Sequence, residues 1–158
     1  MATSTEENYL KTIHSLEEKK GAATVGDIAA VLELTSGTVT TMMHHLSEKG
    51  MIDYAPRKGL KLKERGRKEA LRVIRRHRLI ELFLVEIMKF DWSEVHEEAE
   101  DLEHVISDRL VDRMDEMLGR PTHDPHGDPI PDREGKLADD ASIPLSEAEE
   151  GTYRIARV

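Results

Sequence analysis

Residues 24–66 hold the pattern that most restricts the fold of this chain: two short helical segments, a tight turn and a pair of alternating strands. Thr24 is placed to cap the first helix, and the polar turn ELTSG leads into a second helix that ends at Gly50. The next stretch, MIDYAPRKGLKLKERG, predicts a two-stranded hairpin, because leucine and lysine alternate over residues 60–63. A helix-turn-helix followed by a basic hairpin is the winged-helix arrangement, whose second helix enters the major groove of DNA.

The start of the second helix is rich in hydroxyl side chains and has no Arg or Asn that would read a base with two hydrogen bonds. We therefore expect DNA shape and apolar contact with thymine methyl groups to give specificity. Hydroxyls also cap helices, so capping is the alternative role for at least one of them. The residues that we expect to contact DNA are Thr35, Ser36, Thr38, Thr40 and Thr41 on this helix and Arg57, Lys58 and Lys61 on the hairpin.

Charge is strongly segregated along the chain. The formal net charge is −9, but the window from Arg57 to Arg78 has eleven Lys or Arg residues against two acidic ones, a net charge of +9. From Asp91 to Glu116 the balance reverses, with eleven acidic residues against two arginines. The basic window is typical of a surface that binds a polyanion, and we expect it to contact DNA phosphates. Two solvated helix faces that differ by chance are the alternative explanation.

The rest of the chain is predicted to be mainly helical. We expect helices over residues 5–19, 64–88, 94–107 and 108–118. Ser4 and Glu7 have the spacing of a capping box at the first of these helices, and Ser93 is placed to cap the third. A turn-rich linker follows, and the last residues, GTYRIARV, predict one strand. The predicted fold class is therefore mainly α.

The stretch HEEAEDLEH, residues 96–104, places two histidines and five acidic residues in nine positions. On one helix, four of these residues share a face that borders the apolar arc: His96, Glu100, Glu103 and His104. Carboxylate and imidazole groups at the edge of a core repel or stay unsatisfied unless a cation or a basic partner lies among them. A solvated acidic face is the alternative.

A second pair of candidate ligands lies on the predicted helix 64–88. His77 and Glu81 interrupt its apolar stripe one turn apart, which is a natural two-donor arm for a cation. The chain has no cysteine, so any metal must be bound by nitrogen and oxygen. Such a set with several carboxylates suits Mn²⁺ or Fe²⁺, although Zn²⁺ or Co²⁺ would bind at least as tightly in vitro.

Together these motifs resemble the diphtheria toxin repressor family of metal-dependent repressors, including its manganese transport regulator branch. The segments that match in order and spacing are YLKTIHSLEE, SGTVTTMMHHLSEKGMI, RHRLIELFL, VHEEAEDLEHVISD and PHGDPIP. The resemblance implies a winged-helix DNA-binding domain over residues 1–65 and a helical dimerisation and metal-binding domain over 66–135. Residues 136–158 would form a linker and the beginning of an SH3-like domain.

The resemblance also implies two metal sites. The primary, regulatory site would consist of Asn8, Glu100, Glu103 and His104, and the ancillary site of His77, Glu81 and His96. Asn8 stands where relatives generally have Met or Asp, and Lys11 replaces an acidic residue that part of the manganese branch uses. Asp124 and His126 stand where some manganese-responsive relatives have ligands of a second site, and ordinary turn residues are the alternative for both.

The function implied is that of a metal-dependent transcriptional repressor. A homodimer would bind palindromic operator DNA when Mn²⁺, or alternatively Fe²⁺, occupies these sites, and would control genes of metal-ion homeostasis. We favour manganese, because Glu100 stands where iron-responsive members have cysteine. The alternatives are a winged-helix regulator that senses a small organic ligand, a winged helix that binds only protein, and a metallohydrolase.

We expect no enzymatic activity and no small-molecule substrate, because the sequence has no candidate nucleophile or base outside the ligand set. No apolar run approaches the length of about 18 residues that a membrane span requires. The start, MATSTEENYL, lacks the basic and apolar regions of a signal peptide. We therefore expect a cytoplasmic protein.

Overall fold

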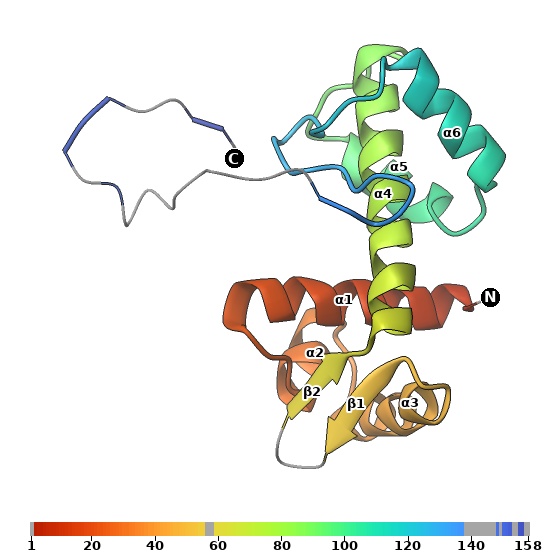
Figure 1. Cartoon of the computed structure of the whole chain (residues 1–158), viewed down its shortest axis with the longest axis vertical. Helices are drawn as coiled ribbons and strands as arrows, with labels where there is room; N and C mark the ends of the chain where they lie inside the picture. The colour runs from red at the N-terminus through yellow and green to blue at the C-terminus, as the bar shows by residue number, and fades with distance from the viewer. Residues whose placement is uncertain (1, 56–58, 138–147, 149, 153–154, 157–158) are drawn as a thin grey trace. The chain divides into compact units, whose positions relative to one another are not determined.

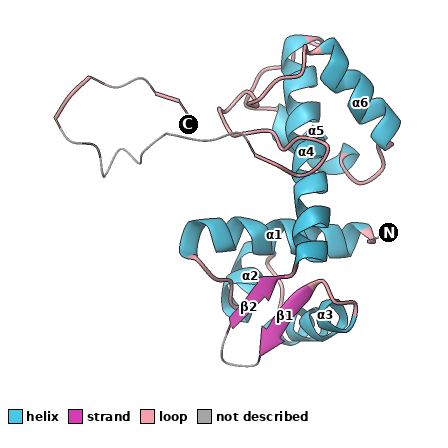
Figure 2. Ribbon diagram, in the orientation of Figure 1, coloured by secondary structure: helices cyan, strands magenta, loops and turns pink. Residues whose placement is uncertain are grey.

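The computed structural model describes residues 2–55, 59–137, 148, 150–152 and 155–156. The chain forms two compact units, Met1–Val73 and Ile74–Val158, and the colours of Figure 1 follow the order of their elements. Helices make up most of the regular structure and one two-stranded sheet makes up the remainder, so the mainly α fold is confirmed (Figure 2). Among the described residues, no helix is long and apolar enough to cross a membrane.

The first unit has the winged-helix order of elements that the sequence predicted. It contains α1 (Ser4–Lys20), α2 (Val25–Val31), α3 (Ser36–Glu48), β1 (Ile52–Ala55), β2 (Gly59–Leu62) and the first turns of α4 (Glu64–Glu86). β1 and β2 pair antiparallel, with Ile52 opposite Leu62, and form the hairpin that follows α3 (Figure 2). Thr24 caps α2 as predicted, because its side chain accepts a hydrogen bond from the N–H of Asp27.

One apolar cluster holds these elements together. Side chains at helical spacing on α1 pack with alternate residues of the hairpin and with the inner faces of α2 and α3. Each large aliphatic side chain that becomes fully buried contributes about 1.5–3 kcal/mol. The fully buried large apolar residues of this cluster are Leu10, Ile13, Ile28, Met43, Leu46, Met51, Ile52 and Leu60. The cluster therefore fixes α3 with its hydroxyl-rich start on the surface.

The capping box of α1 lies one residue earlier than predicted. Thr3, and not Ser4, is the N-cap: its Oγ1 accepts from the N–H of Glu6, and Glu6 Oε2 accepts from the N–H of Thr3 at 2.8 Å. Both frames have the same spacing, and Glu6 selects this one because its other oxygen contacts His45 and Lys49 of α3. Burial raises the pKa of Glu6, but hydrogen bonds from Lys49, Thr3 and His45 outweigh it and lower the pKa to about 2.

In the second unit, α4 continues and is followed by α5 (Val95–Leu102) and α6 (Asp108–Met117). The predicted helix over 108–118 is confirmed, but the predicted helix over 94–107 is wrong at its C-terminal end, and its cap is wrong. The N–H and the hydroxyl of Ser93 both donate to Asp91, while Ser107 caps α6 instead. An N-cap residue has an extended backbone, so the chain must leave helical geometry before Ser107.

The interior stripe of α4 matches the prediction except at its end. α4 stops at Glu86, and Ile87 is 45% exposed. The buried members of the stripe are Ala70, Val73, Ile74, His77, Ile80, Glu81 and Leu84. Two polar side chains, His77 and Glu81, are therefore held inside an otherwise apolar stripe, as the sequence indicated.

Residues 119–131, most of which belong to the turn-rich segment that the sequence predicted, pack against α4. Arg75 donates to the carbonyl of Pro131 at 2.8 Å and to Asp115 at 2.9 Å, and Arg78 donates to the carbonyl of Pro129. Ile130 lies in an apolar cluster with Leu79 and Val111. Half of the predicted C-terminal strand, residues 153–154 and 157–158, lies outside the described residues, and residues 151–152 and 155–156 are not in a strand. Arg57 and Lys58 also lie outside the described residues.

Candidate metal centre

Three potential metal ligands meet at the corners of a nearly equilateral triangle in the second unit. His77 Nε2 lies 3.0 Å from Glu81 Oε1 and 3.1 Å from His96 Nδ1, and His96 Nδ1 lies 3.1 Å from Glu81 Oε1. Adjacent ligands of an octahedral ion with bonds of about 2.1 Å are about 3.0 Å apart. The triangle therefore has the dimensions of one face of an octahedral coordination sphere, and its two imidazoles and one carboxylate fit a divalent transition metal.

Two helices position this triangle. One helical turn separates His77 and Glu81 on α4, so both side chains project from the same face, and His96 comes from the first turn of α5. Glu81 is only 2% exposed and His77 only 9%. The His96 side chain is 64% exposed, so the centre is buried on the α4 side and open to solvent on the α5 side. This leaves a route for a cation to enter.

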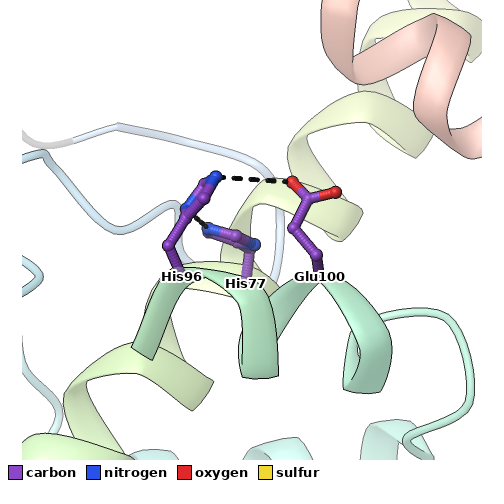
Figure 3. A group of neighbouring side chains, drawn as sticks. All are labelled: His77, His96 and Glu100. Atoms are coloured by element: carbon purple, nitrogen blue, oxygen red, sulfur yellow. Dashed lines mark hydrogen bonds and ion pairs between the residues drawn. The ribbon is translucent and has the colours of Figure 1, made fainter. Parts of the chain in front are cut away.

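Glu100, which the sequence assigned to the primary site, lies beside the ancillary residues. Figure 3 shows its carboxylate directed toward His96, whose Nε2 lies 3.8 Å from Glu100 Oε1. One ligand atom from each of His77, His96 and Glu100 falls within 4.8 Å of the others. Two ligands of one ion with bonds of about 2.2 Å are at most about 4.4 Å apart, so a small movement of Glu100 would complete the set.

Glu103 and His104, also assigned to the primary site, continue the same network. Glu103 Oε2 lies 2.7 Å from His77 Nδ1, and Glu103 Oε1 lies 3.3 Å from His104 Nε2. Glu103 is fully buried. A carboxylate on one imidazole nitrogen orients the ring and leaves the other nitrogen to bind metal. Glu103 therefore joins the predicted primary and ancillary sets into one contiguous group.

The ionisation of Glu81 favours a cation site. Burial raises the pKa of this carboxyl, but hydrogen bonds and charge interactions with His77, a hydrogen bond with His96 and the charge of His126 outweigh burial and lower the pKa below its ordinary value. A carboxylate that stays charged inside an apolar stripe is ready to bind a divalent ion at neutral pH.

The two residues predicted from the loop before PIP have different surroundings. His126 Nε2 lies 3.9 Å from Glu81 Oε1, and its ring meets the edge of Trp92 at 5.5 Å between ring centroids. Asp124 instead accepts the N–H groups of His126 and Asp128, both at 2.9 Å, and pairs with Arg78. Burial raises the pKa of Asp124 more than the N–H of Asp128 and the charge of Arg78 lower it. Trp92 was not predicted to be a site residue, because one tryptophan in the segment FDWSEV does not indicate a contact with His126.

The predicted DNA-contacting residues that the structure describes lie at the start of α3 and on β2 in the first unit. Thr35 caps α3, and the hydroxyls of Thr40 and Thr41 donate to the carbonyls of Ser36 and Gly37. Lys61 is exposed on β2, between two buried leucines. Asn8, the fourth predicted ligand of the primary site, belongs to α1 of this unit, and its participation stays a prediction.

The basic window does not act as one surface. Arg75 and Arg76 are buried and pair with Asp115 and Asp108, and Arg78 pairs with Asp124. The expectation that the whole window contacts phosphate is therefore wrong for these three arginines. Their carboxylate partners lie 32 to 46 positions further along the chain, so no local pattern could separate them from the exposed lysines.

Comparison with known proteins adds an independent observation. The family model described as "Iron dependent repressor, N-terminal DNA binding domain" matches residues 1–60, and "Iron dependent repressor, metal binding and dimerisation domain" matches residues 63–132. The chain is 39% identical over 127 residues to the iron-dependent repressor IdeR of Mycobacterium tuberculosis, which covers 80% of this chain and 55% of the relative. The chain thus spans about half the length of that relative.

Two further proteins match over more of their length. The HTH-type transcriptional regulator MntR of Shouchella clausii is 36% identical over 118 residues, which is 75% of this chain and 82% of the relative. A solved structure of a manganese-dependent transcriptional repressor in complex with manganese is 37% identical, with a TM-score of 0.89 over 97% of this chain and 71% of that one.

Proposed function

Because this chain belongs to the diphtheria toxin repressor and MntR family of metal-dependent repressors, we propose that it represses transcription by binding operator DNA when a divalent cation occupies its second unit. The observation that carries the proposal is the triangle of His77, Glu81 and His96, with edges of 3.0–3.1 Å, in a chain whose first unit is a winged helix. The proposed role is regulatory, and no catalytic step is assigned to these residues.

The proposed cation is Mn²⁺, with Fe²⁺ as the alternative. The donors of the described group are imidazole nitrogens and carboxylate oxygens, and a set with several carboxylates suits Mn²⁺ and Fe²⁺. Zn²⁺ or Co²⁺ would bind at least as tightly in vitro, because affinity for such donors rises along that series. Coordination number and cellular availability would then determine which metal acts as the regulator.

The ligand assignment is also proposed. His77, Glu81 and His96 bind the ancillary cation, and His126 is close enough to Glu81 to join them. Asn8, Glu100, Glu103 and His104 bind the regulatory cation. The buried turn contacts of Asp124 make it a structural support of the His126 loop in preference to a ligand.

In the proposed mechanism the cation shifts the equilibrium between conformations of the homodimer. A metal bound by both Asn8 of α1 and the acidic residues of the second unit would favour one arrangement of the DNA-binding units in a homodimer. That arrangement would place two α3 helices at the spacing of successive major grooves, about 34 Å. Without the cation, the dimer would sample other spacings and bind DNA weakly. The genes under control would be those of metal-ion homeostasis.

The test is DNA binding measured by fluorescence anisotropy, using a duplex selected from a random pool by the wild-type protein in MnCl₂. EDTA is expected to abolish specific binding, and added Mn²⁺ is expected to restore it. Titrations with Fe²⁺ and Zn²⁺ then rank the metals. Unchanged affinity in EDTA would refute metal control and would favour a regulator that senses an organic ligand.

Two variants locate the sites. Glu81→Ala and Glu100→Ala are each expected to weaken Mn²⁺ binding in isothermal titration calorimetry, because each removes a carboxylate donor. Glu97→Ala is the matched control, since Glu97 lies on the same helix as Glu100 and is exposed. If Glu100→Ala still responds fully to Mn²⁺, the proposed regulatory site is misplaced.

A further inference from the structure

Glu6 is a buried carboxylate in the DNA-binding unit that none of the proposed metal sites uses. Its side chain is 2% exposed. Oε2 accepts the N–H of Thr3 at the start of α1. Oε1 accepts a hydrogen bond from Lys49 Nζ at 2.5 Å and lies 2.6 Å from His45 Nε2. Both of these partners stand in or next to the last turn of α3, so one carboxylate joins the first turn of α1 to the end of the helix proposed to read DNA.

The end of α3 has a second anchor at the start of α4. Arg65 Nη1 donates to the carbonyl of Lys49 at 3.1 Å. Gly66 packs so closely that a methyl group added there would lie 2.1 Å from the carbonyl oxygen of Met51. α3 is thus held at one end by two other helices. Of these two polar contacts, the one through Glu6 comes from the helix that carries Asn8.

The Glu6 contact resists being broken. A buried carboxylate that loses its partners keeps its desolvation cost, and leaving one charge of a buried pair uncompensated is strongly destabilising. If the first turn of α1 moves, Glu6 either moves the end of α3 with it or gives up hydrogen bonds to Lys49 and His45 together. Because loss of these hydrogen bonds would leave a buried charge uncompensated, the two turns are expected to move as one body.

We propose that Glu6 is a positioning residue that couples the cation bound through the first turn of α1 to the orientation of the recognition helix α3. The inference rests on the proposed function, in which Asn8, two residues after Glu6, contributes to the regulatory cation. It assigns Glu6, His45 and Lys49 the role of transmitting cation binding to α3, which differs from binding the metal and from contacting a base.

The experiment compares operator affinity in excess MnCl₂ with operator affinity in EDTA, for wild type and Glu6→Gln, on the duplex selected by the wild-type protein. The quantity of interest is the ratio of the two affinities. Glu6→Gln is expected to reduce this ratio about tenfold, because it replaces a charged hydrogen-bond acceptor by a neutral one. Mn²⁺ affinity of the free protein is expected to stay at the wild-type value.

Lys49→Met provides a test from the other side of the contact, at a side chain that is 37% exposed and therefore tolerant of substitution. It is expected to reduce the ratio as well, and the double variant Glu6→Gln, Lys49→Met should be no worse than the more severe single variant. Reciprocity gives an independent readout: operator DNA should raise Mn²⁺ affinity in wild type and raise it less in each variant.

Glu17→Gln is the matched control. Glu17 is also a buried carboxylate of α1, but it bonds the N–H of Leu62 and the side chain of Arg67. This variant is expected to keep the wild-type ratio even if its stability falls. A wild-type ratio in Glu6→Gln, or an equal loss in Glu17→Gln, would overturn the inference and leave the proposed function intact. A wild-type protein with no Mn²⁺ dependence would remove the proposed function itself.

Discussion

At the scale of single residues, Gly66 shows how closely two parts of the first unit approach. Alanine is normally more stable than glycine inside a helix, by about 1 kcal/mol. At Gly66 the added methyl would lie 2.1 Å from the carbonyl oxygen of Met51, a backbone atom that cannot rotate away. Gly66→Ala is therefore expected to lower the free energy of unfolding by about 1–3 kcal/mol, measured by urea denaturation and circular dichroism.

Gly26→Ala is the control for this substitution. Gly26 also lies in a helix, α2, and its added methyl would meet only Thr24 Oγ1 at an ordinary 3.8 Å. We expect no loss of stability, or a gain of up to about 1 kcal/mol. Equal destabilisation by both substitutions would show that close backbone approach is not the cause.

The pairing of His77 and Glu81 could be predicted from the sequence because its cue is local, whereas the place of His96 beside them was implied by the family resemblance. His77 and Glu81 are one turn apart within an apolar stripe, and burial of such a pair demands a compensating group. The contact between Glu103 and His77 could not be predicted in the same way. It depends on the packing of α5 against α4, which brings together residues 26 positions apart in the chain.

At the scale of elements, the short helix α2 depends on the ionised carboxylate of Asp27. Lys20 Nζ and Thr24 Oγ1 each donate to this carboxylate at 2.6 Å, and these hydrogen bonds hold the pKa of Asp27 below its ordinary value. A carboxyl whose pKa is lowered by folding adds stability above its unfolded pKa, and this stability disappears as the pH falls through its folded pKa.

Asp27→Asn is therefore expected to lower the melting temperature at pH 7, and the gap between wild type and variant is expected to narrow as the pH falls below about 3.8. Differential scanning calorimetry between pH 3 and pH 7 measures both effects. Asp53→Asn, at an exposed position of β1, is the control and should run parallel to wild type. A gap that stays constant down to pH 3 would contradict this account of Asp27.

Helix ends were the least predictable part of the elements, for two different reasons. At α1, Thr3 and Ser4 offer the same capping spacing, and the choice depends on contacts of Glu6 with residues about forty positions away. Between α4 and α6, both Ser93 and Ser107 offer a capping hydroxyl, but Ser93 donates to Asp91 and only Ser107 of these two, with extended backbone, caps a helix. Helix interiors and the presence of the hairpin were predictable, because hydrophobic periodicity is repeated over several residues.

At the scale of the whole molecule, the separation of the basic window into internal and exposed parts gives a quantitative expectation for DNA binding. Lys61 is exposed on the hairpin, whereas Arg75 and Arg76 are occupied by carboxylates of their own unit. The logarithm of operator affinity should fall linearly with the logarithm of salt concentration, and Lys61→Ala should reduce that slope by about 0.9 if Lys61 contacts one phosphate.

Lys89→Ala is the control for the salt experiment, because Lys89 is an exposed lysine of the second unit. Its salt slope should equal that of wild type. An unchanged slope in Lys61→Ala would mean that this lysine makes no phosphate contact, and Lys61 would then lose its assigned role in DNA binding. Basic residues are concentrated between Arg57 and Arg78, as the sequence shows. Which of them form internal ion pairs and which are exposed depends on tertiary contacts.

The packing of residues 119–131 against α4 sets a lower limit on the length of a chain that can fold. A truncation after α6 would remove Ile130 from the cluster with Leu79 and Val111. It would also remove the carbonyl groups that accept hydrogen bonds from Arg75 and Arg78. Buried guanidinium groups without acceptors are costly, so the smallest autonomous version of the second unit extends at least to Pro131. Cleavage in this segment is then expected to unfold the second unit, with His77, Glu81 and His96 still present in the polypeptide.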